Sequence, residues 1–498
     1  MPTISNIAYR LLGTCLLLLL FFPKGASQTS PNVLFIISDD LNTRIGPYMN
    51  LPEHTPNLNR LAEEGVQFSR AYCQYPLCGP SRASIMSGLY PETNGVKGNQ
   101  HVRGSYRGSH PDLANHPSLA GFFREQGYFT ARVSKIFHMG VPGGIERGEA
   151  GDDDPDSWDY AYNVMGPETL SPGKLELLSP GNLHYGSNFA RMMLEDGTEA
   201  TQTDYLATNQ AIALLESRAA AVANRATNKV KIKPQAPFFL AVGLVRPHVP
   251  FIAPQRNFTP YPDEDMVVPD SIVGPNVPEQ AQFRRNARIW DMSERQKQQT
   301  ISGYMASVQF MDEQVGRLLQ TLDRLNLRQN TIVVFLSDHG YNLGEHDSWS
   351  KVSLWEGSVR VPLIIATPEE TPASGQVYSG VTELIDLYPT LVDLCGLSAK
   401  APSILQGRSR AGFIRSAQVE DAPDSAYTIT RGGASIRSAR WRYVRWGEKL
   451  EGANEQLYDH QNDPEEKVNL VENPAYGDTL VELRQLWEEK RAEARKER

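Results

Sequence analysis

The run Val33-Leu34-Phe35-Ile36-Ile37 is continuously apolar and rich in β-branched residues, and Ser38-Asp39-Asp40 follows it directly. Much later in the chain, Thr331-Ile332-Val333-Val334-Phe335-Leu336 has the same character and is followed by Ser337-Asp338-His339-Gly340. Continuous apolar runs of this length are typical of strands that are buried on both faces of a parallel sheet. The two runs therefore predict two central strands of one sheet, each with an acidic pair at its carboxyl end.

Helical and extended patterns alternate around these two runs. Helical patterns occupy residues 117–126, 204–221, 304–322 and 383–394, and extended patterns occupy residues 238–242 and 361–365. Such alternation is typical of an α/β fold in which helices cover both faces of a mostly parallel sheet. The stretch from the 140s to the 190s is rich in Gly, Pro and acidic residues, so we expect long surface loops there.

The pattern of apolar and polar residues changes after about residue 412. Short alternating runs at 425–430, 434–436 and 441–446 precede a charged helical pattern that begins at about Asp478. They predict a small antiparallel sheet with a closing helix. A chain of 498 residues also exceeds the usual size of a single core. We therefore expect a large α/β domain over residues 28–412 and a small α+β subdomain over residues 413–498.

The composition excludes several classes of protein. Hydrophobic residues make up 40% and charged residues 21% of the chain, which argues against long disorder, collagen and coiled-coil rods. The 49 basic and 58 acidic residues give a net charge of −9, and no long basic tract is present. A nucleic-acid-binding protein would normally show a basic footprint. An anionic substrate would have to be attracted by local positive groups in a cleft.

The first 27 residues have the pattern of a secretory signal peptide. Arg10 supplies a positive charge, residues 11–22 are almost entirely apolar, and small residues near Ser27 offer a cleavage site. The apolar run is too short to span a bilayer comfortably, and no later segment approaches that length. We therefore expect an exported protein, periplasmic or extracellular, that is not inserted in a membrane.

Removal of this segment leaves Cys73, Cys78 and Cys395, too few for a disulfide scaffold. Cys395 ends an apolar helical pattern, so a buried, inert thiol is expected there. Cys78 instead begins Cys78-Gly79-Pro80-Ser81-Arg82, at the start of a short helix that ends at Gly88. A nucleophile at a helix N-terminus favours an anionic substrate. By spacing alone, the segment is equally consistent with a structural turn that carries an incidental thiol.

The acidic pairs at the two strand ends predict a metal site. Asp39, Asp40 and Asp338 would repel one another at the carboxyl edge of one sheet unless a cation neutralised them. Three carboxylates with one imidazole, that of His339, suit Ca²⁺ or Mg²⁺ better than zinc. The alternative is that each pair merely caps the helix that follows it.

Several short motifs together resemble one family. Cys78-Gly79-Pro80-Ser81-Arg82 resembles the C-x-P-S-R signature of type I sulfatases, whose cysteine is oxidised to formylglycine before folding. Supporting motifs occur in the same order over most of the chain: Asp39-Asp40, Pro56-Asn57-Leu58, Gly88-Leu89-Tyr90-Pro91, Ser337-Asp338-His339-Gly340, Gln456-Leu457-Tyr458-Asp459 and Asn462-Asp463-Pro464. Three others resemble the iduronate-2-sulfatase-like branch: Lys135-Ile136-Phe137-His138, Arg246-Pro247-His248 and Gly344-Glu345-His346.

The resemblance implies an alkaline-phosphatase-like fold and a role for each matching position. Asp39, Asp40, Asp338 and His339 would bind Ca²⁺, with Mg²⁺ as a substitute, together with formylglycine at position 78. Arg82 would hold the aldehyde hydrate and offset charge near the metal. Lys135 and Lys351 would bind sulfate oxygens, and His138 and His248 would transfer protons. The formylglycine hydrate can attack sulfur and then release sulfate by returning to the aldehyde. A thiol that attacked sulfur would have no comparable way to release the sulfate.

The sequence thus predicts a sulfatase that acts on a sulfated glycan, after a maturase has modified Cys78 in the unfolded chain. Arg103, with Lys97 and Arg107, belongs to a basic loop that either contacts a second anionic group of the glycan or is solvated surface. Two alternatives stay open: a phosphodiesterase or phosphonate hydrolase with the same nucleophile, and a catalytically silent glycan-binding protein in which Cys78 stays a thiol. The arginines of the C-terminal region alternate with apolar residues as on a half-exposed strand, which indicates a structural role: Arg437, Arg440, Arg442 and Arg445.

Overall fold

The computed structural model describes most of the chain. The described residues are 30–51, 54–99, 106–180, 188–227, 236–270, 273–274, 276–282, 291–418, 425–448 and 454–495, without the side chains of residues 109 and 221–227. The expected signal peptide over residues 1–27 and the expected substrate ligand Arg103 lie outside them. No helix in the described part is both long and apolar enough to cross a membrane.

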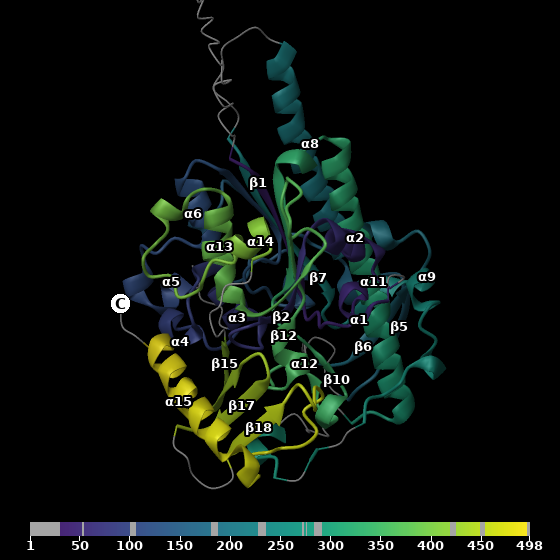
Figure 1. Ribbon diagram of the computed structural model, residues 1–498. Helices are drawn as coiled ribbons and strands as arrows, with labels where there is room; N and C mark the ends of the chain where they lie inside the picture. Colours follow the sequence, from purple (N-terminus) through teal and green to yellow (C-terminus); the bar gives the residue numbers. More distant parts are fainter. Residues whose placement is uncertain are drawn as a thin grey trace, which may run out of the picture.

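A large, mostly parallel sheet forms the centre of the molecule (Figure 1). Its strands in spatial order are β12 (Arg360–Val361), β2 (Val66–Tyr72), β13 (Leu363–Ala366), β9 (Thr331–Ser337), β1 (Asn32–Asp39), β7 (Phe238–Pro247), β3 (Phe129–Ser134) and β4 (Tyr160–Tyr162), and β14 (Val377–Glu383) pairs with β2. β1 runs parallel to both of its neighbours, β7 and β9. The pairs that β2 and β9 form with β13 are antiparallel, and β12, which precedes β13 across Pro362, is antiparallel to β2 in the same direction.

Helices cover both faces of this sheet, as the alternation of patterns predicted. Val33, Phe35 and Ile37 of β1 pack in one core and Leu34 and Ile36 pack in the other. The first core is covered by α3 (Cys78–Ser87), α6 (Leu119–Glu125) and α13 (Leu387–Leu394). The second is covered by α2 (Pro56–Glu64), α8 (Thr203–Thr227) and α11 (Glu294–Arg324), which lie together on one side in Figure 1. The continuous apolar run of β1 is thereby explained, since every side chain in it is buried.

The remaining elements are short. The short α-helices are α1 (Gly46–Met49), α4 (Pro91–Asn94), α5 (Tyr106–Ser109), α7 (Gly143–Glu146), α9 (Gln255–Phe258), α12 (Glu356–Val359) and α14 (Ala411–Ser416). The 3₁₀ turns used below are η9 (Leu384–Asp386) and η10 (Ser398–Lys400), and β10 (Asn342–Leu343) pairs with β11 (Trp349–Ser350). The helical pattern expected over 383–394 is therefore divided into η9 and α13.

The expectation of long surface loops from the 140s to the 190s was wrong in part. β5 (Gly173–Leu177) and β6 (Ala190–Leu194) pair in this region, and β6 also pairs with β8 (Phe251–Pro254) in a three-stranded sheet. The acidic residues are not all solvated either, since Asp153 is buried and accepts a 2.7 Å hydrogen bond from Arg132. Acidic composition indicated surface, but buried partners from β3 neutralise this carboxylate.

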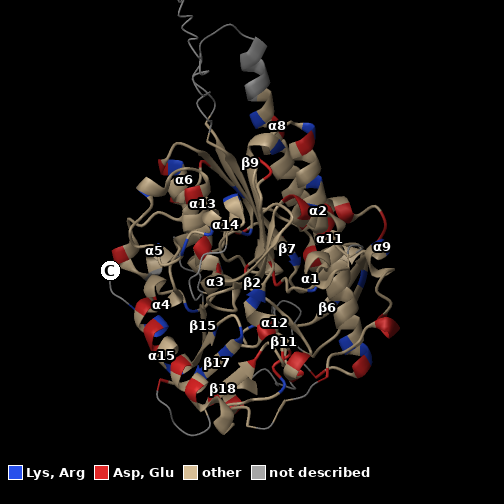
Figure 2. Cartoon of the chain, in the orientation of Figure 1, with Lys and Arg blue, Asp and Glu red and all other residues tan. Residues whose placement is uncertain are grey.

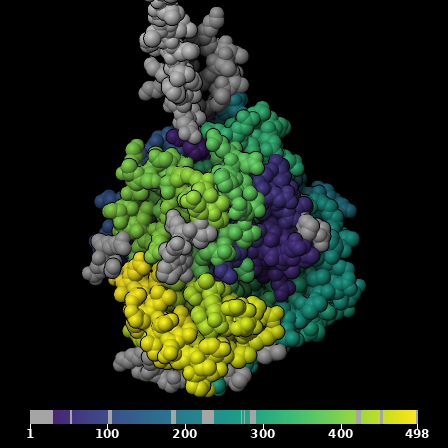
Figure 3. Space-filling model, viewed as in Figure 1, coloured from purple at the N-terminus to yellow at the C-terminus, as the bar shows by residue number. Residues whose placement is uncertain are grey.

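The C-terminal region forms the expected antiparallel sheet and closing helix. Its elements are β15 (Ala426–Thr430), β16 (Gly433–Arg437), β17 (Trp441–Trp446), β18 (Glu455–Asp459) and α15 (Gly477–Ala494). They gather at one end of the molecule, in yellow in Figure 3. Glu383, at the end of β14, joins this sheet to the rest of the chain, because it accepts hydrogen bonds from the Tyr90 hydroxyl at 2.7 Å and from the Tyr427 amide at 2.9 Å.

The arginines of the C-terminal sheet are more buried than the half-exposed pattern predicted. Arg437 and Arg445 are buried and Arg442 is fully buried, whereas the Arg440 side chain is exposed. The Arg442 guanidinium donates to Glu356 of α12 and to Glu466. Charged residues of both signs are otherwise dispersed along the chain in Figure 2. The alternation of apolar and basic residues could not reveal that a second layer of structure covers the polar face.

This buried ion network depends on both partners. Burial raises the pKa of Glu466, but Arg442 and His460 outweigh it and lower the pKa to about 2. Burial also raises the pKa of Glu356, and Arg437 and Arg442 outweigh it and hold the pKa below its ordinary value. Both carboxylates have lowered pKa values when folded, so the stability they contribute is complete above about pH 4.5 and is lost as the pH falls toward 2.

We predict that Arg442→Met lowers the free energy of unfolding by about 3–5 kcal/mol at pH 7, because two buried carboxylates lose their counter-charge. Urea titration at pH 7 and pH 4 measures this loss, which should shrink at pH 4 as the unpaired carboxylates become protonated. Arg440→Met is the matched control, since the Arg440 side chain is exposed and its partner Asp459 keeps hydrogen bonds from the Gln461 amide and from Asn462, so the loss should be small. Equal losses for the two variants, or a larger loss at pH 4, would contradict the assignment.

Candidate active site

The carboxyl ends of β1 and β9 bring the two predicted acidic pairs together. The strands pair in register from Asn32 opposite Thr331 to Ser38 opposite Ser337. Beyond this point the Asp40 amide lies 3.3 Å from Asp338 Oδ1. Asp39, Asp40, Asp338 and His339 all have zero exposure. Adjacent parallel strands end at the same edge of a sheet, so the convergence follows from their pairing.

Cys78 lies at the first residue of α3 and faces this cluster. Its Sγ atom is 3.3 Å from His339 Nε2 and 3.2 Å from Lys351 Nζ. The helix starts here because Pro80 suits its first turn, and it ends at Gly88, whose φ of 70° is left-handed. The backbone amide of Gly79 donates a 2.8 Å hydrogen bond to Asn99 Oδ1, which fixes the start of the helix against a neighbouring loop.

Arg82, one turn after Cys78, links three segments of the site. Its Nε donates to Asp338 Oδ2 at 2.7 Å, and its Nη2 lies 3.6 Å from Asp39 Oδ1. Its Nη1 donates to the carbonyl groups of Lys135 and Ile136. The guanidinium is completely buried, so it neutralises part of the carboxylate charge without help from solvent.

Two lysines bind different carboxylates of the acidic cluster. Lys135, just after β3, donates to Asp39 Oδ2. Lys351, in the loop after β11, donates to Asp40 Oδ1 at 2.6 Å. Gly243 of β7 allows the Lys135 backbone to approach, because a Cβ at this position would lie 2.1 Å from the Lys135 carbonyl oxygen. The two ammonium groups come from segments far apart in the chain and reach the same carboxylate pair.

The two predicted histidines also reach the site. His138 is buried and hydrogen-bonds Cys78. His248 Nδ1 lies 2.7 Å from the Val249 carbonyl oxygen, so this nitrogen carries the proton, and Nε2 lies 3.7 Å from Asp40 Oδ2. The loop that carries His248 is held by Arg246, which donates to the carbonyl groups of His248 and Pro250 at 2.9 and 2.7 Å.

The charges around Cys78 change the acidity of its neighbours. Burial raises the pKa of the Cys78 thiol, but Lys351, Lys135 and His339 outweigh it and hold the pKa well below its ordinary value. Burial raises the pKa of Asp338 to about 6, although Arg82 opposes the shift. Burial lowers the pKa of His138. The site therefore favours an anion at position 78 and a neutral imidazole at His138. Burial lowers the pKa of His339, but Asp338 and Cys78 outweigh it and raise the pKa to about 9.

The donor set fits a hard divalent cation. Asp39, Cys78, Asp338 and His339 each offer a ligand atom, and these atoms all lie within 4.8 Å of one another. Asp39 Oδ1 and Asp40 Oδ2 are buried and accept no hydrogen bond from any described residue. Buried carboxylate oxygens are normally satisfied, so two such atoms that face one cluster are suited to bind a metal ion.

The structure brings together ten of the residues expected to form the site: Asp39, Asp40, Cys78, Arg82, Lys135, His138, His248, Asp338, His339 and Lys351. Arg103 is not among the described residues. The sequence analysis missed the roles of Ser81, whose hydroxyl donates to the Asp338 carbonyl, and of Asn99, which accepts from Gly79. Ser81 belongs to the recognised motif, but nothing in the sequence around Asn99 indicates its contact.

Comparison with known proteins agrees with this arrangement. The family profile described as Sulfatase matches residues 31–397, and that described as N-sulphoglucosamine sulphohydrolase, C-terminal, matches residues 344–493. A sulfatase of Formosa agariphila is 31% identical over 96% of this chain and 91% of that protein. The mouse iduronate 2-sulfatase is 30% identical over 95% of this chain and 97% of that protein.

The fold is also shared with solved structures. A phosphonate monoester hydrolase from Silicibacter pomeroyi superposes with a TM-score of 0.72 over 93% of this chain and 95% of that one, at 22% identity. Solved sulfatases with the alkaline-phosphatase-like fold superpose as well, as the sequence resemblance implied. The extent of the family match and the identity to known sulfatases together establish that this chain belongs to the sulfatase family.

Proposed function

We propose that the protein is an exported, calcium-dependent sulfatase that hydrolyses an O-sulfate ester of a sulfated carbohydrate, with formylglycine at position 78 as the nucleophile. One observation carries the proposal: Cys78 lies between the Lys351 ammonium and the His339 imidazole, beside a buried carboxylate cluster. The relative named iduronate 2-sulfatase supports a sulfated sugar as the substrate class. Degradation of a sulfated polysaccharide is the setting that fits an exported enzyme of this kind.

Modification of Cys78 must precede folding in this proposal. The side chain is 1% exposed and α3 is buried along its whole length. A maturase could not reach the thiol in the folded chain, so it has to act on the unfolded one. The proposal also assigns the catalytic unit to residues 28–412 and a supporting α+β subdomain to residues 413–498.

Asp39, Asp40, Asp338 and His339 would hold Ca²⁺, or Mg²⁺ as a substitute, together with the oxygen of residue 78. When bound, such a cation lowers the pKa of a hydroxyl and polarises a sulfate oxygen. Arg82 Nη2 is buried and makes no hydrogen bond with a described residue, so it can donate to the modified side chain at position 78. Lys135 and Lys351 supply positive charge for the sulfate oxygens.

The histidines divide the proton transfers between the two ends of the reacting sulfate. His138, hydrogen-bonded to position 78, takes the proton that must leave this residue when the aldehyde is regenerated. His248 donates through Nδ1 to the Val249 carbonyl, so its Nε2 is the nitrogen that faces Asp40 and the reacting groups. With Lys351 it would deliver a proton to the leaving sugar oxygen.

The shared fold of the phosphonate monoester hydrolase gives a second candidate, hydrolysis of a phosphonate or phosphodiester by the same nucleophile. Paired assays on sulfate and phosphonate esters distinguish the two reactions. A preference for the sulfate ester in kcat/KM is expected. If the protein carries only a thiol at position 78 and binds glycans without cleaving them, it is instead a catalytically silent glycan-binding protein.

The first prediction of this proposal concerns position 78. Peptide mass spectrometry of protein made with a maturase should find formylglycine there, and Cys78→Ala should lower kcat about a thousandfold or more, because the nucleophile is lost. Cys395→Ala is the control, since this buried thiol lies in another part of the core. Active enzyme in which position 78 is entirely cysteine would refute the proposed nucleophile.

The second prediction concerns the metal. Elemental analysis of active protein should find one calcium per chain, and Asp338→Asn should lower both the bound calcium and the activity. Asp312→Asn is a matched control, because Asp312 is a buried carboxylate whose partners are Asn57 and Leu58, away from the site. Full activity of metal-free enzyme, or of Asp338→Asn, would end the assignment.

The third prediction concerns the leaving group. His248→Ala and Lys351→Ala should slow cleavage of a sulfated sugar by about 10²-fold or more, and cleavage of an activated aryl sulfate by less. The reason is that a phenolate departs without a proton, whereas a sugar alkoxide does not. Single-turnover rates at saturating substrate separate chemistry from binding. Equal losses on both substrates would indicate sulfate binding in place of proton delivery.

A further inference from the structure

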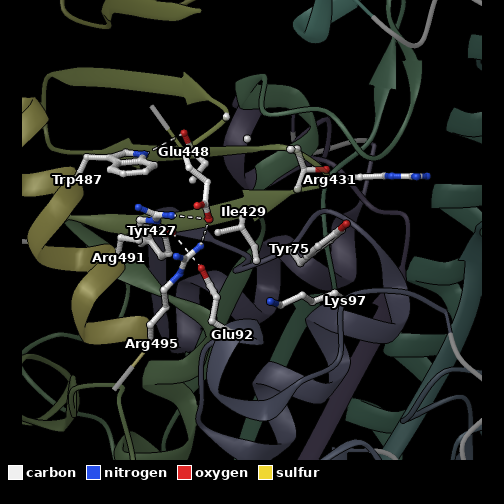
Figure 4. A pocket seen from close by; sticks show the side chains of 15 residues that line it. Tyr75, Glu92, Lys97, Tyr427, Ile429, Arg431, Glu448, Trp487, Arg491 and Arg495 are labelled. Carbon is white, nitrogen blue, oxygen red and sulfur yellow. Dashed lines mark hydrogen bonds and ion pairs between the residues drawn. The ribbon is translucent and has the colours of Figure 1, made fainter. Parts of the chain in front are cut away.

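A cavity of about 560 Å³ lies between the start of α4, the β15–β16 turn and the C-terminal helix α15 (Figure 4). It is separate from the residues assigned above to metal binding and proton transfer. Four basic and two acidic residues line it, so positive charge is in excess. These residues are Lys97, Arg431, Arg491 and Arg495, against Glu92 and Glu448.

The positive charge is only partly neutralised inside the cavity. Glu448 Oε1 lies 2.7 Å from Arg491 Nη2 and 3.3 Å from Arg495 Nη2, and Figure 4 shows these contacts on one side of the cavity. Lys97 and Arg431 come from the other side in this view: the Lys97 ammonium points into the cavity toward Glu92, whereas the Arg431 guanidinium points away from the cavity. Neither forms an ion pair with another described residue. Because the Glu448 side chain is 74% exposed, an incoming anion can compete with it for the two arginines.

Two segments that line the cavity also contact residues of the candidate active site. Thr430, in the wall, donates a 3.5 Å hydrogen bond to the carbonyl group of Val352, the residue after Lys351. Asn99, two residues after Lys97, accepts a hydrogen bond from the backbone N–H of Gly79 at the start of α3. The same two segments thus hold the catalytic helix and lysine on one side and line the cavity on the other.

The turn at the mouth of the cavity leaves its backbone accessible. Gly432 has a φ of 88°, and a Cβ built there would meet no atom within 4 Å. Gly433 must lack a side chain, because its Cβ would lie 2.5 Å from the Trp446 ring. The two glycines therefore place Arg431 on a turn with open space beside it.

From this placement we propose that the cavity is an anion-binding subsite for the substrate. It accepts a second anionic group, a sulfate or a carboxylate, on a sugar next to the one that carries the scissile ester. The inference rests on the proposed sulfatase function and extends it. It predicts a preference for glycans with at least two anionic groups over singly charged sulfate esters, and a loss of that preference at high ionic strength.

Steady-state kinetics on three sugars test the proposal. The sugars are a disulfated uronate-containing disaccharide, its counterpart without the second sulfate, and its counterpart with the uronate carboxyl reduced. Lys97→Gln should raise KM for the disulfated sugar about threefold with kcat unchanged, and Arg431→Gln should raise it less, because the Arg431 side chain points out of the cavity. One of the two modified disaccharides should no longer show this rise in KM. The group that this disaccharide lacks, the second sulfate or the carboxylate, is the one that occupies the cavity.

Glu448→Gln gives the opposite expectation, since it releases Arg491 and Arg495 from their internal partner. It should lower KM for the disulfated disaccharide about threefold and leave KM for an aryl sulfate unchanged. Lys400→Gln, at an exposed lysine of η10 that does not line the cavity, is the charge-matched control for Lys97→Gln. If these variants affect all substrates alike, or none, the subsite proposal is overturned.

Calorimetric binding of the same disaccharides to the Cys78→Ala protein keeps the two proposals apart. Weaker binding to Cys78→Ala/Lys97→Gln than to Cys78→Ala supports the subsite even if the enzyme cleaves another ester. Equal binding to both proteins overturns the subsite while activity of the wild-type enzyme on an aryl sulfate still upholds the sulfatase. A wild-type enzyme that cleaves no sulfate ester overturns the proposed function alone.

Discussion

Three carboxylates without solvent access at the end of two parallel strands are the constraint on which the rest of this structure depends. Asp39, Asp40 and Asp338 have zero exposure and belong to two groups of potential ligands that share Cys78. Isolated charges in such a place would be too costly to keep ionised, so each needs a positive partner. Much of the fold around the cluster supplies such partners.

These partners come from segments that lie far apart in the chain. Arg82 is contributed by the helix that covers one face of the sheet, Lys135 by the end of β3, and Lys351 by a loop that follows β11. Each also contacts a second structural element, as Arg82 does through the carbonyl groups after β3. Charge neutralisation and backbone positioning are therefore carried by the same side chains, which makes a preorganised site out of groups that would otherwise repel.

The C-terminal subdomain extends this arrangement in two ways. Its sheet is joined to the main body by Glu383 and by the buried pair of Arg442 with Glu356, so it cannot shift without breaking buried polar contacts. It also carries Thr430, which contacts the segment of Lys351. The C-terminal sheet thus braces the loop that carries Lys351 and, in our proposal, contributes one wall of a subsite for the substrate.

The sequence by itself determined the central strands, several of the helices that cover them and the residue types of the site. The runs that end at Asp39 and Asp338 identified buried parallel strands, because only strands covered on both faces need unbroken apolar sequence. The signature at Cys78 identified the family, since a short motif with a chemical requirement tolerates little variation.

Only the tertiary structure decided which side chains meet. Lys351 donates to Asp40 across 311 positions of sequence, and no periodicity carries that information. The contact of Asn99 with Gly79 and the burial of Arg442 were likewise invisible, because both depend on a second segment that packs over them. Local sequence encodes local conformation and burial, whereas the partner of a buried charge is chosen by the packing of distant elements.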